Sequence, residues 1–394
     1  MQYEFDVTID RTGTGSSKWL HAPKAVQAAQ VMPFSVADME FCVPPQIMQA
    51  VQRACMHGIY GYTMADEAYL SGLASWMQRR HGWEIQPEWV VTTFGVVPAI
   101  NTAIRALTQP GDGVIIQPPV YPPFARSVQN NERVLLENPL QLVDGRYEMD
   151  FDGLAALCER PEAKLLLLCS PHNPVGRVWS EQELRRVGEI CAQNGVVVVA
   201  DEIHQDIAFA PHRHHVFATL GEAYRENCIV CTALSKTFNI AGLNCSNILI
   251  PNAQLRQAFN RQLEVESYHG LPYFAYAASL AGFAKCDAWL EEMKQAVQDN
   301  FAVLQAFFAE HFPSCKMVAP EGTYLAWIDC RGWGLSEDEL MRFLEEEALW
   351  GVNRGSTFGA QGEGHIRFNL ASPKHEIQAA LLRLQKAAQA RGLA

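Results

Sequence analysis

The sequence lacks long hydrophobic runs, and this absence excludes proteins that span membranes. Apolar stretches such as residues 165–169 and 196–200 fall far short of the roughly 20 residues that a transmembrane helix needs. The chain begins MQYEFDVTID, with early acidic residues and no apolar segment, so we expect no secretory signal. We therefore expect a cytoplasmic protein without a membrane partner.

Positive charge is scarce as well. The chain has 31 Lys and Arg against 43 Asp and Glu, a formal net charge of −12. A surface of this sign does not favour nucleic acid as the main partner. We expect a small-molecule substrate, since the overall charge leaves room for a local basic pocket.

Cysteines are present but do not form an even, regularly spaced set. The 394 residues include 11 cysteines scattered along the chain, which is typical of reduced thiols in a large cytosolic enzyme. A chain of this length can bury its own core without disulfides or a structural metal. Its composition, 48% hydrophobic and 19% charged, also excludes a disordered chain.

Short apolar runs alternate with helical patterns over most of the chain. This pattern is typical of parallel strands covered by helices on both faces, which predicts a doubly wound α/β sheet. The expected strands are residues 89–93, 113–117, 164–169, 196–200, 228–232 and 246–250, and the expected helices include 44–57, 66–81, 96–107, 180–193 and 253–268.

The pattern changes after about residue 270. A long helical stretch at 272–311, strands at 323–329 and 365–369, and helices at 336–349 and 373–390 predict a smaller α+β domain. We expect a large domain at 44–285 and a small domain at 286–394. We expect the N-terminal arm, 1–43, to join the small domain because it has no strand pattern of its own.

Chemically distinctive residues come directly after five of the expected strands. Ligands of open α/β sheets bind at the carboxyl ends of the strands, so these residues are expected to meet. Each residue alone has an ordinary explanation as a turn, a cap, a packed aromatic or a surface charge. In chain order they are Gly95, Val96 and Val97 at a helix start, then Tyr121, Asn173, Asp201 with His204, and Ser235 with Lys236.

Together these residues favour a pyridoxal phosphate (PLP) site. Lys236 supplies the amine that binds the cofactor aldehyde as a Schiff base. Asp201 suits the pyridine nitrogen, because only the protonated ring is a strong electron sink. Asn173 and His204 suit the phenolate oxygen, and Tyr121 can stack on the ring.

The cofactor phosphate is expected at the start of a helix. Backbone N–H groups of Gly95, Val96 and Val97 suit a phosphate dianion, since helix N-termini bind anions. Ser235, next to the lysine, can add a hydroxyl.

Several motifs resemble those of the class I/II aminotransferase superfamily, whose members are fold-type I PLP enzymes. They are Asn173-Pro174-x-Gly176, Asp201-x-x-His204 and Ser235-Lys236. Within this superfamily the chain is most similar to the branch of C–S β-lyases, which act as cystathionine β-lyases or cysteine-S-conjugate β-lyases. Four segments carry that resemblance: residues 10–19, 33–41, 56–62 and 233–242.

The resemblance implies the aspartate aminotransferase-like fold and further site residues. It implies that Arg367 binds the substrate α-carboxylate, which a guanidinium fork suits better than a lysine, although an arginine there can also be a surface charge. Asn173 and Ala37 are implied beside the substrate. Tyr62 is implied to reach into the site of a neighbouring subunit, in a homodimer with shared active sites.

Four positions depart from the family patterns. Ala233 stands where general aminotransferases usually carry Ser or Gly, His204 where many have Tyr, and Asn244 where many have Arg. These three fit the lyase branch better than general aminotransferases, and they leave the phosphate contacts open. Glu40 replaces an expected aspartate, so the sequence does not define its role.

The implied activity is α,β-elimination from L-cystathionine or a related S-substituted L-cysteine, giving a thiol, pyruvate and ammonia. Lys236 would move the α-proton, and Tyr121 or Tyr62 would help the sulfur leave. An aminotransferase shares the early steps and differs in where the next proton goes, so the cofactor residues do not separate the two activities. A catalytically idle regulatory protein is a third possibility, disfavoured by the joint presence of Lys236, Asp201 and Arg367.

Three other patterns have simpler explanations, so we expect no metal site. Residues 212–215, His-Arg-His-His, lack the spacing and acidic partners of a metal site and predict a solvated loop. Cys228 and Cys231 are expected in the core on opposite faces of a strand. Residues 13–15, Gly-Thr-Gly, come after no strand and are no dinucleotide motif, while Tyr324 and Trp327 suit either the pocket or the core.

Overall fold

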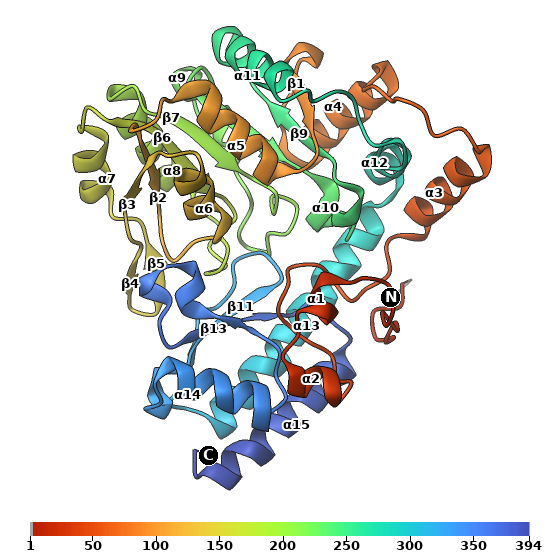
Figure 1. Cartoon of the computed structure of the whole chain (residues 1–394), viewed down its shortest axis with the longest axis vertical. Coiled ribbons are helices and arrows are strands. Elements are labelled where there is room, and N and C mark those ends of the chain that lie inside the picture. Colours follow the sequence, from red (N-terminus) through yellow and green to blue (C-terminus); the bar gives the residue numbers. More distant parts are fainter. Residues whose placement is uncertain (1–2, 394) are drawn as a thin grey trace.

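The computed structural model describes residues 3–393, and a seven-stranded sheet dominates it (Figure 1). Its strand order is β1-β9-β8-β7-β6-β2-β3, and every neighbouring pair is parallel except those of β9, which is antiparallel to β1 and β8. The strands are β1 (Val90–Thr93), β2 (Gly113–Ile116), β3 (Val134–Glu137), β6 (Ala163–Cys169), β7 (Val197–Asp201), β8 (Cys228–Thr232) and β9 (Ser246–Leu249).

Helices cover both faces of this sheet, because successive side chains of a strand point to opposite faces. Leu166 and Leu168 of β6 belong to one hydrophobic core, and Leu165 and Leu167 belong to the other. The predicted doubly wound architecture is confirmed. The first core includes residues of α4 (Glu67–His81), α7 (Phe151–Cys158), α8 (Glu181–Gln193) and α12 (Tyr273–Lys285), and the second those of α5 (Val96–Leu107), α6 (Pro123–Asn130) and α11 (Ala253–Val265).

The two cysteines of β8 obey the same alternation. Cys228 packs in the first core and Cys231 in the second, and both are fully buried. Their three-residue spacing therefore reflects strand geometry, as the sequence predicts, and neither thiol is placed to share a metal with the other.

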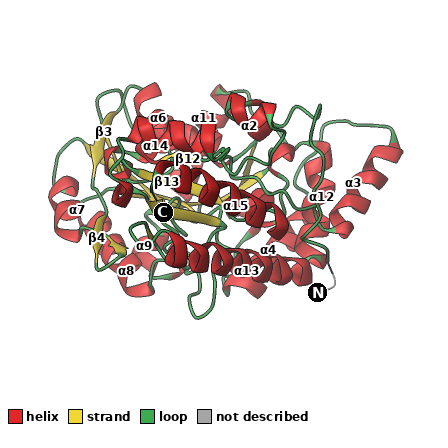
Figure 2. Ribbon diagram, turned by 90° about the horizontal axis from the view of Figure 1, so that it is seen from below, coloured by secondary structure: helices red, strands yellow, loops and turns green. Residues whose placement is uncertain are grey.

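A second, antiparallel sheet forms the core of the smaller α+β unit. Its order is β10 (Lys316–Met317), β11 (Leu325–Asp329), β13 (His365–Asn369) and β12 (Asn353–Arg354). Helices α13 (Asp287–His311) and α15 (Lys374–Arg391) lie side by side over it (Figure 2), with α14 (Glu337–Arg342) beside them. We propose the division at 285/286 because α12 packs on α3 (Pro45–His57) and α4, whereas α13 packs along α15.

Some helices and strands differ from the expectation. The stretch 272–311 is two helices, because the backbone turns at Cys286, where φ is −115° and ψ is 10°. The expected helix 336–349 continues beyond α14 as a π-helical turn over Phe343–Glu347. Strand β3 and the hairpin β4 (Gln141–Val143) and β5 (Arg146–Glu148) were not expected, since their mostly exposed residues give no apolar pattern. Within the described residues, no helix combines the length and apolar character needed to cross a membrane.

The N-terminal arm runs along the smaller sheet. The Phe34 amide donates to the Gly351 carbonyl at 2.6 Å, and the Asn369 amide donates to the Phe34 carbonyl at 3.0 Å. The Phe34 ring stacks on Phe368 with centroids 4.4 Å apart. The arm also contains two short helices, α1 (Ser17–Leu20) and α2 (Lys24–Ala28), whereas residues 1 and 2 of the expected arm and residue 394 of the expected small domain lie outside the described residues.

A buried network of charges fixes the arm. The Lys18 ammonium lies 2.9 Å from Asp38 and 2.8 Å from Glu40, and Arg11 bonds the same two carboxylates at 2.9 and 2.7 Å. The side chains of Lys18 and Glu40 are fully buried. Glu40, whose role the sequence leaves undefined, is therefore part of the ion network that holds residues 36–41 in place.

Removing one cation from this network should destabilise the fold. We expect Lys18→Met to lower the free energy of unfolding by about 3 kcal/mol, because it leaves buried carboxylates short of a partner. The measurement is the urea midpoint at pH 7. Lys24→Met is the matched control, since Lys24 is exposed on α2 and its substitution should change stability by less than about 0.5 kcal/mol. Equal midpoints for the two variants would contradict this account of the arm.

Candidate active site

One cavity of about 570 Å³ brings together nearly all the predicted site residues. It lies where the carboxyl ends of the parallel strands face the smaller sheet, the position in which open α/β sheets bind ligands. Tyr62 is the exception: it does not line the cavity and is fully exposed in the loop after α3. The predicted residues that line the cavity are Ala37, Gly95, Val96, Val97, Tyr121, Asn173, Asp201, His204, Ser235, Lys236 and Arg367.

Asp201 ends β7 and is buried, with 3% of its surface exposed. Its register neighbours on β6 and β8 are Cys169 and Cys231, which offer no charge. Burial raises the pKa of Asp201 to about 7, although the Ile203 amide at 3.1 Å and the nearby charge of Lys236 favour the ionised form. A carboxyl held this way favours a cationic partner such as a protonated ring nitrogen.

Lys236 lies on the one-turn helix α10 (Leu234–Thr237), directly after β8. Its ammonium donates a hydrogen bond to the Ala37 carbonyl at 2.6 Å, and it takes part in no ion pair of the described chain. Burial is the main cause that lowers the pKa of Lys236 to about 8. The amine can therefore exist without its proton near neutral pH, as a nucleophile or base requires.

Arg367 projects from β13 and is held by neutral oxygens. Its guanidinium donates to the Asn173 side chain at 3.0 Å, to the Asn353 side chain at 2.7 Å and to the Ser35 carbonyl at 3.0 Å. It lies 4.9 Å from the centroid of the Phe358 ring.

Two further features show that the Arg367 guanidinium is not electrostatically satisfied. Its Nε has no hydrogen-bond partner, and none of the ion pairs among residues 3–393 includes it. Burial lowers the pKa of Arg367 to about 10, so the side chain stays charged at neutral pH. A buried cation with no carboxylate partner is suited to bind an anion.

His204 and Asn173 line the same cavity as Lys236 and Arg367. Burial, together with those two cations, lowers the pKa of His204 to about 3, so its imidazole is neutral. Its Nδ1 has no partner, and its ring meets Tyr324 edge-on at 5.7 Å. Asn173 holds Arg367 through its side-chain oxygen, a contact that the sequence does not predict.

The start of α5 and Tyr121 also line the cavity. Gly95 adopts φ +129°, a conformation that L side chains rarely take, and it precedes the first helical residues, Val96 and Val97. Their amides are among those that a helix start leaves without an internal acceptor. Burial, followed by the charge of Asp201, raises the pKa of Tyr121, so its phenol keeps its proton.

Residues that contact the site and escaped the sequence analysis, or were left open by it, include Ser35, Asn353, Phe358 and Tyr324. Ser35 acts through its backbone carbonyl, which no side-chain pattern reveals. Asn353 lies on the two-residue strand β12, and Phe358 ends a short 3-10 helix over Gly355–Phe358, so neither falls in a recognisable motif. Tyr324 donates to the Ala37 carbonyl at 2.9 Å.

The side chains of Tyr324 and Trp327 both lie in the packed core. Trp327 donates to the Tyr147 hydroxyl at 3.1 Å, and both aromatic side chains are fully buried outside the cavity lining. The choice between pocket and core is therefore resolved in favour of the core.

The prediction of a solvated loop at residues 212–215 is wrong for one residue. His212 and Arg213 are exposed, but the His214 side chain is 2% exposed and lies 2.8 Å from the buried carboxylate of Glu202. The sequence could not reveal this contact because the partner lies 12 residues earlier in the chain. Over residues 3–393, no group of three or more potential metal ligands is arranged to hold an ion.

Comparison with known proteins places this site in a family. Residues 29–384 match the model of the family described as aminotransferase class I and II. The chain is 39% identical to cystathionine beta-lyase PatB of Bacillus subtilis, over 97% of this chain and 99% of that protein.

Solved structures share the fold over almost the whole chain. Cystalysin from Treponema denticola, whose structure contains pyridoxal 5′-phosphate, is 37% identical with a TM-score of 0.95, over 99% of this chain and 100% of that one. A PLP-bound C–S lyase from Staphylococcus hominis is 31% identical with a TM-score of 0.91, over 98% of each chain. The predicted PLP-dependent transferase fold is confirmed, and the chain belongs to the aminotransferase class I and II family.

Proposed function

We propose that this chain is a PLP-dependent C–S β-lyase that releases a thiol, pyruvate and ammonia from L-cystathionine or a related S-substituted L-cysteine. The observation that carries the proposal is the cavity in which Lys236 and Arg367 lie as buried cations without carboxylate partners. The similarity to cystathionine beta-lyase PatB and to a C–S lyase of known structure supports the reaction type.

The residues of the cavity fit PLP. The buried carboxyl of Asp201 suits the pyridine nitrogen, and the neutral imidazole of His204 has an unpartnered Nδ1 that suits a ring oxygen. The start of α5 at Gly95 and the Ser235 hydroxyl offer donors for a phosphate. When bound, PLP supplies an aldehyde for the amine and a ring that withdraws electrons from the substrate α-carbon.

The other end of the cavity suits the substrate carboxylate. Arg367 has a free Nε and is otherwise held by neutral oxygens, so an α-carboxylate would neutralise a charge that the protein leaves uncompensated. Ala37 lines the same end, and its carbonyl bonds Lys236. Arg367 thus orients an amino acid with its α-carbon toward the lysine.

Elimination needs two proton transfers, and Lys236 can carry out one of them and Tyr121 the other. The Lys236 amine, with its pKa lowered to about 8, takes the proton from the substrate α-carbon. As the bond between Cβ and sulfur breaks, the sulfur keeps the electron pair, and the protonated phenol of Tyr121 can donate a proton to it. An acid and a base that line the same cavity suit elimination, and the similarity to C–S lyases favours it over amino transfer.

An assay without keto acid tests the assignment. We expect the purified holoenzyme to release pyruvate and thiol from L-cystathionine or S-ethyl-L-cysteine, and Lys236→Ala to lose at least about 1,000-fold in kcat, because the lysine is both attachment point and base. Pyruvate is measured with a coupled dehydrogenase and thiol with a disulfide dye. Brisk amino transfer to a keto acid without pyruvate release would instead identify an aminotransferase.

The raised pKa of Asp201 predicts a pH-dependent stability difference. An aspartate with pKa 3.8 when unfolded and about 7 when folded stabilises the fold below pH 3.8, and this contribution is lost as the pH rises to 7. In the cofactor-free protein, we expect Asp201→Asn to be more stable than wild type at pH 8, by up to about 4 kcal/mol, and equal to it near pH 4.

The measurement is urea unfolding of both proteins at the two pH values. Asp152→Asn is the control, because the Asp152 side chain is 99% exposed and its loss should give no such pH-dependent difference. An Asp201→Asn protein that is less stable than wild type at pH 8 would show that the carboxylate is stabilised in the empty site.

We also propose a homodimer whose subunits share their active sites. The end of α3 and the loop after it expose apolar side chains that a lone chain would leave in water: Met56 is 85% exposed, Ile59 70%, Met64 66%, and Tyr62 is fully exposed. Helix α3 lies at the edge of the molecule (Figure 1), where a second copy can cover this loop. Contiguous exposed apolar residues of this kind mark protein interfaces.

Mixed dimers test whether Tyr62 completes the site of the other subunit. We expect Lys236→Ala and Tyr62→Ala to be nearly inactive alone, and their co-expression to restore about a quarter of wild-type activity, because half of the dimers would contain one complete site. Activity per subunit is measured on the co-purified mixture. The absence of any recovery, in a mixture shown to contain mixed dimers, would contradict shared sites.

A further inference from the structure

The loop after β7 has buried contacts on the side away from the cofactor cavity as well as on the side that faces it. Asp201 and His204 face the cavity, whereas Glu202 and Asp206 are buried and do not line it. The Glu202 carboxylate lies 2.8 Å from His214 and accepts a hydrogen bond from the Phe217 amide at 2.8 Å. The first turn of the loop is therefore anchored on the side away from the proposed cofactor.

Asp206 makes the equivalent anchor at the other end of the loop. One carboxylate oxygen lies 2.9 Å from His81 Nε2, and the other accepts a hydrogen bond from the Thr237 hydroxyl at 2.7 Å. Burial alone would raise the pKa of Asp206, but the bonds from His81 and Thr237 and the charge of Arg80 hold it below its usual value. Asp206 is therefore an ionised, fully paired carboxylate.

Thr237 comes immediately after Lys236 on α10, a helix of one turn. A single turn has too few internal hydrogen bonds to hold its own shape, so tertiary contacts must fix the backbone at the lysine. The Thr237 hydroxyl is fully buried and has Asp206 as its acceptor. A hydrogen bond to a charged acceptor is roughly twice as strong as one between neutral groups.

We propose that Asp206 is a positioning residue for the lyase reaction. Acting through Thr237, it sets the distance between Asp201 at the start of its own loop and Lys236 at the end of the next strand. It touches neither substrate nor cofactor. The proposal rests on the proposed function, because it matters for catalysis only if Lys236 carries the cofactor.

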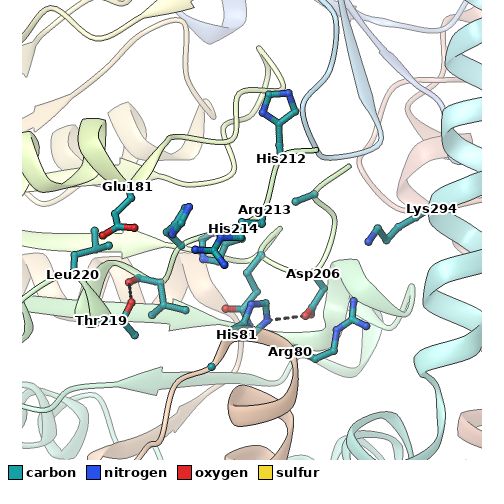
Figure 3. Close-up of a pocket in the computed structure, with 15 residues that line it drawn as sticks. Arg80, His81, Glu181, Asp206, His212, Arg213, His214, Thr219, Leu220 and Lys294 are labelled. Carbon is teal, nitrogen blue, oxygen red and sulfur yellow. Dashed lines mark hydrogen bonds and ion pairs between the residues drawn. The ribbon is translucent and has the colours of Figure 1, made fainter. Parts of the chain in front are cut away.

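A second cavity, of about 490 Å³, opens on the far side of this network. Figure 3 shows His81, joined to Asp206, at the cavity wall with His214 close by; the two imidazole rings meet edge to face at 5.7 Å. Other charged groups face the pair from neighbouring elements: Arg80 from α4, Lys294 from α13, Arg213 from the loop, Glu181 from α8, and the buried Glu202. Small molecules can thus reach the position of His81 without entering the active site.

Removing the Thr237 hydroxyl tests the proposal most directly. We expect Thr237→Val holoenzyme to lose about 10- to 100-fold in kcat while KM for S-ethyl-L-cysteine changes less than about threefold, since a misplaced reacting group costs rate rather than binding. The pH midpoint of the cofactor's visible absorption should also shift. Thr219→Val is the matched control: that hydroxyl donates to the Val216 carbonyl at 2.7 Å in the wall of the second cavity, away from Lys236.

Chemical rescue separates positioning from a general loss of folding. His81→Gly should lose rate like Thr237→Val, and added imidazole, entering through the second cavity, should restore most of it by bonding Asp206 again. Imidazole should not rescue Asp206→Asn or Thr237→Val. If Asp206→Asn fails to fold, Thr237→Val still tests the positioning role of Asp206, because it removes only one hydroxyl.

The possible outcomes are distinguishable. A Thr237→Val enzyme with wild-type kcat and an unshifted absorption midpoint overturns the positioning role, even when PLP is bound. Wild-type protein that binds no PLP at Lys236, shown by the absence of a borohydride-reducible chromophore, overturns the proposed function instead.

Discussion

The structure depends on holding two cations in one buried cavity, where neither forms an ion pair within residues 3–393. Lys236 and Arg367 are held by carbonyl and amide oxygens, from Ala37, Ser35, Asn353 and Asn173. Neutral acceptors satisfy hydrogen bonds but do not cancel charge, so desolvation of the two cations is only partly offset. The lowered pKa values of both groups express this cost. We propose that an anionic substrate relieves this cost, so that the fold contributes to affinity by leaving both cations without an ion pair.

The N-terminal arm is what allows this arrangement. Its residues 35 and 37 provide the carbonyls that bond Arg367 and Lys236, so a segment far from both in sequence aligns them. The arm is fixed by the buried ion network of Lys18 and Glu40, and Asn239, three residues after the lysine, makes three side-chain bonds to the backbone of Met39 and Phe41. Carboxylates thus pair with cations in the ion network next to the cavity, and not with Lys236 or Arg367 inside it.

The sequence predicted six of the seven strands of the large sheet and the residues that line the cavity at their carboxyl ends, because buried parallel strands give continuous apolar runs and their ends meet at one edge. It could not predict contacts made by backbone carbonyls, such as that of Ser35, since these leave no residue signature. The two-residue strand β12 and the exposed hairpin β4–β5 are too short or too polar to give a pattern. His214 was misread because its acidic partner, Glu202, becomes a neighbour only after folding.

The acids and bases of the cavity suit an elimination reaction. Both reactions need a base at the α-carbon, and Lys236 can provide it. Elimination also needs a proton donor for the departing sulfur. Tyr121 lines the cavity, and burial together with the charge of Asp201 keeps its phenol protonated. The neutral imidazole of His204, with a pKa of about 3, cannot serve as a cationic acid. Of these two groups that line the cavity, the phenol is therefore the better donor, and we propose that it protonates the sulfur as the C–S bond breaks.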